Sequence, residues 1–121
     1  MFLQLNHQKL QVYDTSRLFV TECYKLTRSL PLDERFGMIS QIRRAALSVH
    51  LNIAEGASRK SERERKRFFE ISRGSIVEID AALDIAKELG YINKDTCPLL
   101  GNTMISCFKL LTRLIQSNSK Q

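Results

Sequence analysis

Residues 36–55, with the sequence FGMISQIRRAALSVHLNIAE, decide the fold of this chain. Apolar residues recur here at helical spacing and form a stripe, which consists of Phe36, Ile39, Ile42, Ala46, Val49 and Ile53. A second side of the same segment is also largely apolar and consists of Ala45, Leu47, Leu51 and Ala54. Because a helix that is apolar on two sides is buried on two sides, we expect the second side to contact another subunit.

The segment before it has the same periodicity, with a stripe of Val12, Ser16, Phe19, Cys23, Leu26 and Leu30. The expected N-cap of this first helix is Asn6 or Asp14. Its expected end is at Leu30, because the residue before a proline is disfavoured in a helix and Pro31 follows. The second helix is expected to begin at Asp33, an N-cap residue.

Two more helices are predicted after residues 56–58, which are expected to form a break. Ser61 and Glu64 have capping-box spacing and open the third helix, which Gly90 is expected to end. Its expected inner face consists of Phe68, Ile71, Ser75, Ile76, Ile79, Leu83 and Ala86. The fourth helix is expected to start near Asp95, with Pro98 in its first turn. Its stripe is Leu100, Met104, Cys107, Leu111 and Leu114.

These four segments predict an all-α protein, an antiparallel up-down-up-down four-helix bundle that forms one domain over residues 1–121. No segment alternates with period two, and 5 glycines and 2 prolines leave long uninterrupted stretches. Hydrophobic residues make up 43% and charged residues 26%, as in an ordinary globular protein. The odd number of cysteines, the lack of a signal-peptide pattern and the lack of a membrane-length apolar run indicate a cytoplasmic protein without membrane contact.

Positive charge is concentrated where the third helix begins. Seven of the 19 Lys and Arg residues lie between residues 59 and 73, against three acidic residues, and the whole chain has a net charge of +6. One interpretation is binding of an RNA or DNA phosphate backbone. The candidate contacts are Arg43, Arg44, Arg59, Lys60, Arg63, Lys66, Arg67 and Arg73. The alternatives are a solvated helix face with ion pairs between residues four apart, or a scaffold that docks an acidic protein such as a nuclease or reverse transcriptase.

Polar residues within the second helix are interpreted as structural rather than catalytic. With Glu78 on the third helix, this structural set consists of Ser48, Asn52, Glu55 and Glu78. The expected partners of the Glu55 carboxylate are Arg43, Arg44 and Arg73. The chain has only two histidines and no H-E-x-x-H pattern, so we expect no metal, no other cofactor, no small-molecule substrate and no enzymatic activity.

Two smaller features carry expectations of their own. Gly74 and Ser75 lie within the third helix, where small residues let another helix approach closely. Cys97 lies at a helix start, a position that can lower the pKa of a thiol, but no histidine partner is evident and we expect no nucleophile.

Three blocks of the sequence resemble a known family. They are QIRRAALSVHLNIAEGASR at residues 41–59, RFFEISRGS at residues 67–75 with Glu78, and KELGYI at residues 87–92. Over roughly residues 10–115 the chain resembles the bacterial four-helix-bundle proteins encoded within 23S rRNA intervening sequences. His50 departs mildly from the family pattern, which usually has a small residue or proline there.

The resemblance implies a homopentamer of four-helix bundles that associates with RNA, and it brings no catalytic residues. More distantly, the chain resembles accessory proteins of diversity-generating retroelements, which form similar pentamers and work with nucleic acid and a reverse transcriptase.

Overall fold

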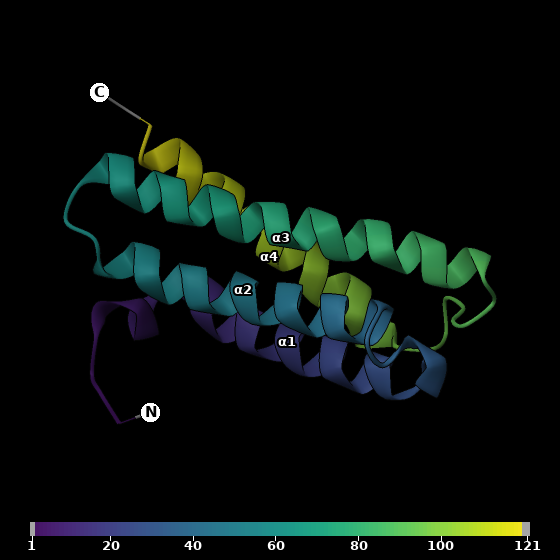
Figure 1. The fold of residues 1–121 in the computed structure, drawn as a ribbon. Coiled ribbons are helices and arrows are strands. Elements are labelled where there is room, and N and C mark those ends of the chain that lie inside the picture. Colours follow the sequence, from purple (N-terminus) through teal and green to yellow (C-terminus); the bar gives the residue numbers. More distant parts are fainter. Residues whose placement is uncertain (1, 120–121) are drawn as a thin grey trace.

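The computed structural model describes residues 2–119 and contains four α-helices and two short 3-10 helices. Their bounds are η1 Asn6–Lys9, α1 Gln11–Arg28, η2 Leu32–Glu34, α2 Met38–Ser58, α3 Glu62–Glu88 and α4 Pro98–Ser117. In Figure 1 the colour sequence runs from left to right along α1 and α3 and from right to left along α2 and α4. Helices that follow one another in the chain are therefore antiparallel. The predicted all-α four-helix bundle is confirmed, and no strand occurs within residues 2–119.

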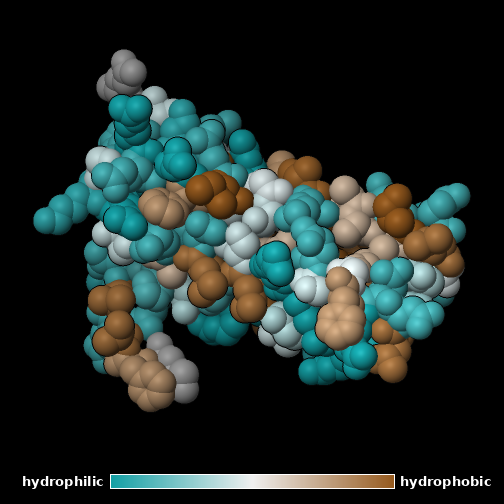
Figure 2. Space-filling model, in the orientation of Figure 1, coloured by the Kyte–Doolittle hydropathy of each residue, from teal (hydrophilic) through white to brown (hydrophobic). Residues whose placement is uncertain are grey.

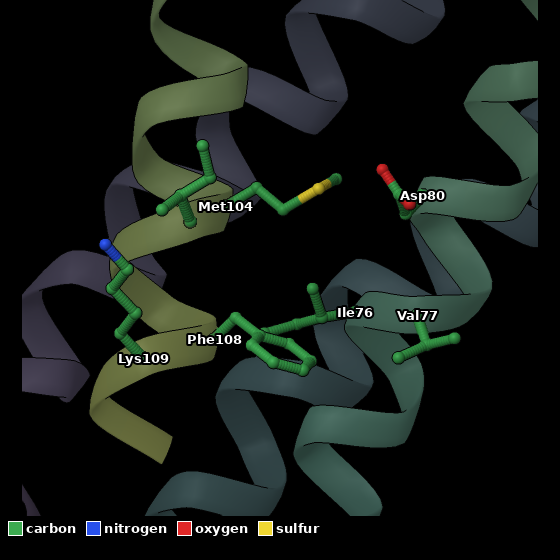
Figure 3. A pocket seen from close by; sticks show the side chains of 7 residues that line it. Ile76, Val77, Asp80, Met104, Phe108 and Lys109 are labelled. Carbon is green, nitrogen blue, oxygen red and sulfur yellow. The ribbon is translucent and has the colours of Figure 1, made fainter. Parts of the chain in front are cut away.

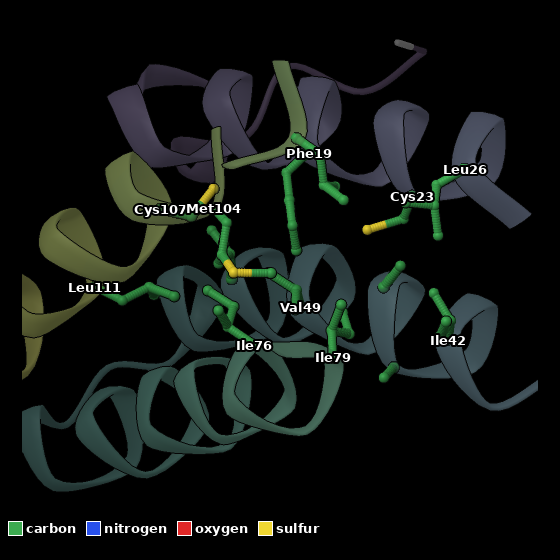
Figure 4. Packing of buried hydrophobic residues seen from close by; sticks show 14 of the residues in the cluster. Phe19, Cys23, Leu26, Ile42, Val49, Ile76, Ile79, Met104, Cys107 and Leu111 are labelled. Carbon is green, nitrogen blue, oxygen red and sulfur yellow. The ribbon is translucent and has the colours of Figure 1, made fainter. Parts of the chain in front are cut away.

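Each helix packs against two neighbours in the cyclic order α1, α2, α3, α4, and the contact between α2 and α3 is the most extensive. No helix in the described part of the chain is both long and apolar enough to cross a membrane. Side chains from all four helices meet between them in one core (Figure 4). Every member of the predicted first stripe is buried there, from Val12 to Leu30. The heptad-like spacing therefore identified the inner side of α1 correctly.

Three residues that were predicted to mark helix ends, Ser61, Gly90 and Pro98, lie at helix ends in the structure. The Ser61 hydroxyl accepts a hydrogen bond from the Glu64 backbone N–H at 3.1 Å and caps α3. Gly90 follows α3 with φ of +77°, the left-handed conformation that glycine adopts at low cost. Pro98 is the first residue of α4, so the predicted start near Asp95 is three residues early.

The predicted start of the second helix at Asp33 is wrong, because α2 begins at Met38. Asp33 lies in η2, and Gly37, with φ of −112° and ψ of −107°, separates that turn from α2. Phe36 was predicted to be in the core but lies before the helix and is 86% exposed. The Arg35 guanidinium covers its ring at 4.8 Å from the centroid.

The expected N-caps of the first helix are also wrong. Leu10 occupies the N-cap position of α1 without a side-chain hydrogen bond. Asn6 lies in η1, and Asp14 lies inside the first turn of α1. Because η1 comes directly before α1, the α-helix begins at Gln11, between the two candidate residues.

Two residues that were assigned to the inner face of the third helix lie elsewhere. Ile71 is 41% exposed and Phe68 is half-buried, whereas Phe69 and Ser72 are buried. The Ser72 hydroxyl donates a hydrogen bond of 2.7 Å to the Val49 carbonyl on α2. Near its start, the face of α3 toward the core is therefore rotated by about one residue from the predicted one, and a buried serine joins α3 to α2. Further along, Ile76, Ile79 and Ala86 are buried as predicted.

The predicted break at residues 56–58 is wrong, because α2 continues to Ser58. Gly56 is buried in the last turns of α2, and a Cβ there would lie 2.9 Å from Cε1 of Phe69 and 3.0 Å from Cβ of Phe68. Gly56 thus permits the close approach of α2 and α3. At Gly74, where the sequence predicted a close approach, a Cβ would meet no atom of the described chain within 4 Å.

The two glycines provide a matched test of this packing. We expect Gly56→Ala to reduce the free energy of unfolding by about 1–3 kcal/mol, because the Phe69 ring must shift. Gly74→Ala should increase it by about 0.5–1 kcal/mol, because Gly74 lies on an open helical surface. Urea denaturation at one protein concentration measures both, and equal effects of the two substitutions would contradict the close approach at Gly56.

Candidate nucleic-acid interface

The end of the bundle at the α2–α3 connection carries four cationic side chains, Lys60, Arg63, Lys66 and Arg67, which we call the basic end. Lys60, Arg63 and Arg67 are exposed and Lys66 is half-buried. Arg63 and Arg67 are one helical turn apart and share a face of α3. Within residues 2–119 none of the four forms an ion pair. Their charges are therefore available to an external anion.

Arg59 was predicted with this group but differs from it, because it has partners within the chain. Its guanidinium lies 3.3 Å from the Glu55 carboxylate and 3.9 Å from that of Glu64. It also covers the Phe68 ring at 4.9 Å from the centroid. Glu55 thus pairs with Arg59, not with the three arginines that the sequence suggested, because Arg59 directly follows the last residue of α2, four residues after Glu55.

Arg65 organises the basic end, although it was not among the predicted phosphate contacts. Its Nη1 donates hydrogen bonds to the carbonyls of Arg59 at 3.1 Å and Lys60 at 2.6 Å. Its Nε donates to Oδ1 of Asn118, just after α4, at 2.9 Å. The available signal was its spacing: Arg65 precedes the buried Phe69 by four residues and shares its side of α3. One guanidinium thus closes the α2–α3 connection and joins it to the end of α4.

The other predicted phosphate contacts lie away from the basic end. Arg43 donates from Nε to Oγ1 of Thr27 at 2.8 Å on the α1 side of α2. Arg73 donates to Oγ1 of Thr112 at 3.1 Å on α4. Arg44 is exposed in the first half of α2. The structure therefore does not bring the eight predicted cations together in one site.

Three members of the structural set, Ser48, Asn52 and Glu78, lie along the α2–α3 seam, whereas Glu55 is exposed and pairs with Arg59. The Asn52 amide donates to the Ser48 carbonyl at 2.8 Å and to the Ser48 hydroxyl at 3.0 Å. The Ser75 hydroxyl on α3 donates to the Ser48 hydroxyl at 3.0 Å. Gln41, two turns nearer the start of α2 than Ser48, donates to Glu78 at 2.8 Å. The bonds of Ser75 to Ser48 and of Gln41 to Glu78 connect the two helices along their outer seam.

His50 links α2 to α1. Its Nδ1 lies 2.6 Å from Oγ of the buried Ser16, and its ring stacks on Tyr13 at 4.4 Å between centroids. Because the single Ser16 hydroxyl hydrogen is donated to the Tyr13 carbonyl at 3.0 Å, both contacts of Ser16 are satisfied when Nδ1 of His50 carries a hydrogen. Burial lowers the pKa of His50, and the charges of Arg17 and His7 lower it further.

The thiols are poor candidates for nucleophiles. Burial raises the pKa of Cys23 and of Cys107 to about 12. A helix start can lower the pKa of a thiol, but at Cys97 burial and the Glu22 carboxylate raise it. Protonated thiols are weak nucleophiles, so these sites offer no reactive thiolate near neutral pH.

Comparison with known proteins gives one family. Residues 8–113 match the family described as 23S rRNA-intervening sequence protein. No curated protein matches the chain significantly.

Substitutions of Arg65 and Arg63 provide a matched pair, because Arg65 stabilises the α2–α3 connection by hydrogen bonds whereas Arg63 only carries exposed charge. We expect Arg65→Ala to reduce the free energy of unfolding by about 1–3 kcal/mol, because two carbonyls and Asn118 lose their donor. Arg63→Ala should change it by less than about 0.5 kcal/mol. Chemical denaturation checks both, and a null result for Arg65→Ala would show that the α2–α3 connection needs no guanidinium.

The low pKa of His50 predicts a loss of stability in mild acid. The unfolded chain binds a proton at His50 near the ordinary value of 6.5, while the folded chain binds it only at lower pH. Stability is therefore fully present above pH 6.5 and falls as the pH drops toward the lowered pKa of the folded state. We expect the midpoint of thermal unfolding to fall more steeply from about pH 7 to about pH 5 in the natural protein than in His50→Gln. Parallel curves for the two proteins would contradict this account.

Proposed function

Because the chain belongs to the 23S rRNA-intervening sequence protein family, we propose that it is a non-enzymatic, homo-oligomeric protein that binds the phosphate backbone of RNA through its basic end. The family is associated with rRNA intervening sequences and is not a known enzyme family. The observation that carries the proposal is the set of four cations without ion-pair partners in residues 2–119, presented on one helix start and its approach.

The separation of charge along the bundle supports binding of RNA at the basic end. Cations gather where α2 ends and α3 begins, and the second half of α3 carries the acidic residues Glu78, Asp80, Asp84 and Glu88. In Figure 2 hydrophilic side chains cover the end at the α2–α3 connection, while hydrophobic patches lie further along over α2 and α3. Lys87 is the one cation among these acidic residues of α3, so a polyanion is attracted to the first end more strongly than to the second and approaches the bundle end-on.

The aromatic residues near the basic end favour recognition of the backbone over recognition of bases. Phe69 is buried, and Phe68 lies half-buried under the Arg59 guanidinium. Stacking on an unpaired base needs an open aromatic face, and neither ring offers one. Long, mobile Lys and Arg side chains instead suit a spaced row of phosphates.

Oligomerisation is the second part of the proposal. Leu47 and Leu51, on the predicted second apolar side of α2, remain 41% and 59% exposed in the single chain. A second copy that covers these leucines would bring several basic ends together. Binding by several weak sites on one RNA then becomes strong through effective concentration.

We expect purified protein to bind a structured RNA with a log affinity that falls with log salt at a slope of about −3 per bundle, as four phosphate contacts require. Arg63→Glu/Arg67→Glu should weaken binding at least about tenfold and flatten the slope by about 2. The matched control is Arg28→Glu/Lys87→Glu, two exposed residues at the opposite end with the same change in net charge. Fluorescence anisotropy across a salt series measures all three proteins.

Absence of binding at about 50–100 mM salt would overturn the proposal, as would equal losses in the two double variants. Competition separates RNA from an acidic protein partner. If polyglutamate displaces the RNA as readily as a polynucleotide of equal charge does, the basic end is a docking surface for acidic proteins.

A further inference from the structure

The outer side of α2 carries four side chains in a line that points away from the core. We call this line, which consists of Arg44, Leu47, Leu51 and Glu55, the α2 ridge. Its members are three or four residues apart and lie on one face. The two leucines are in the middle, a cation lies toward the start of α2, and a carboxylate lies toward its end. Exposed leucines in such an arrangement are typical of a helix that packs into a groove.

A groove of matching character lies between α3 and α4 (Figure 3). It has a volume of about 250 Å³, and its apolar lining consists of Ile76, Val77, Met104, Ile105 and Phe108. Val77 and Ile105 are each 55% exposed, so the single chain leaves the groove open. Asp80 lies on its α3 side and Lys109 on its α4 side, without an ion-pair partner within residues 2–119.

Charge along the two helices that border the groove changes sign from one end to the other. The hydrogen bond from Arg73 to Thr112 sets α3 and α4 in register. At a rise of 1.5 Å per residue, Arg73, whose guanidinium covers the ring of the groove residue Phe108 at 5.7 Å from the centroid, lies about 16 Å along α3 from Asp84. Asp84, with Asp80, makes the border acidic toward the end of α3, and Arg73, with Lys109, makes it basic toward the basic end.

We propose that the α2 ridge of one copy packs into the α3–α4 groove of a second copy, which identifies the subunit contact of the proposed oligomer. Arg44 and Glu55 are about 16 Å apart along α2, close to the spacing of opposite charges along the groove. Arg44 then faces Asp80 and Asp84, and Glu55 faces Arg73 and Lys109. Glu55 already contacts Arg59, but its side chain is still 50% exposed. Leu47 and Leu51 occupy the apolar middle of the groove.

The charges also select the direction of packing. Arg44 and Asp84 both lie toward the end of the bundle where α2 starts and α3 ends. Their pairing places the two bundles parallel, with their basic ends side by side. The opposite direction would bring Arg44 to Arg73 and Lys109 and Glu55 to the aspartates of α3, which is unfavourable. Because the ridge and the groove are different surfaces, the contact is heterologous and generates a ring when its rotation closes. A ring of parallel bundles presents all its basic ends on one face.

Sedimentation velocity without RNA tests the contact independently of nucleic-acid binding. We expect the natural protein to be oligomeric, and Leu51→Glu and Val77→Glu each to be monomeric with an unchanged helical circular dichroism spectrum. An equimolar mixture of the two variants should form a 1:1 dimer, because one retains the groove and the other retains the ridge. A monomeric natural protein, or variants that fail to combine, would overturn the proposal.

Charge exchange tests the direction of packing. Arg44→Asp and Asp80→Arg should each weaken self-association about tenfold, and the double variant should restore it, because every copy supplies both surfaces. Arg28→Asp, an exposed change on α1, should leave self-association unchanged. No recovery in the double variant would contradict the parallel pairing. A natural protein that is monomeric and still binds RNA would overturn the interface and leave the basic end intact. An oligomeric natural protein that binds no RNA would overturn only RNA binding.

Discussion

The close packing of α2 against α3 is the constraint on which the rest of the structure depends. Gly56 leaves space for the Phe69 ring, and the buried Ser72 hydroxyl satisfies the Val49 carbonyl across the same interface. A larger residue at position 56 would separate the two helices next to the short connection that joins Ser58 to Glu62. That connection carries Lys60, so the geometry of the basic end follows from the packing next to it.

The arginines of this protein divide into two groups with different physical roles. Arg65, with its three hydrogen bonds, joins backbone carbonyls of one connection to the end of another helix. A planar guanidinium suits that role because it donates in several fixed directions at once. Arg63 and Arg67, on the same helix but on its outer face, remain free of ion pairs within residues 2–119. A cluster of positive residues in a sequence thus contains both residues that stabilise the structure beneath a surface and residues that expose their charge on that surface.

The two sides of α2 have different consequences for the single chain. Its inner side, with Ile42, Val49 and Ile53, is buried in the bundle core. Its outer side keeps two leucines in contact with water between charged residues. Burial of an exposed leucine is worth about 1.5–3 kcal/mol, so a partner of suitable shape has a substantial driving force. Packing of the α2 ridge into the α3–α4 groove would bury these leucines and would also align the basic ends.

The sequence by itself determined the helical class, the number of helices, the inner side of α1 and the caps at Ser61 and Gly90. These features depend on local chemistry, namely the spacing of apolar residues and the conformations that a hydroxyl cap or a glycine permits. It also located the concentration of positive charge. Only the tertiary structure decided that Phe36 lies outside the core, that Gly56 and not Gly74 is the site of close approach, and that Arg65 is part of the support. Those outcomes depend on which side chains of distant segments meet, and the periodicity of one helix does not contain that information.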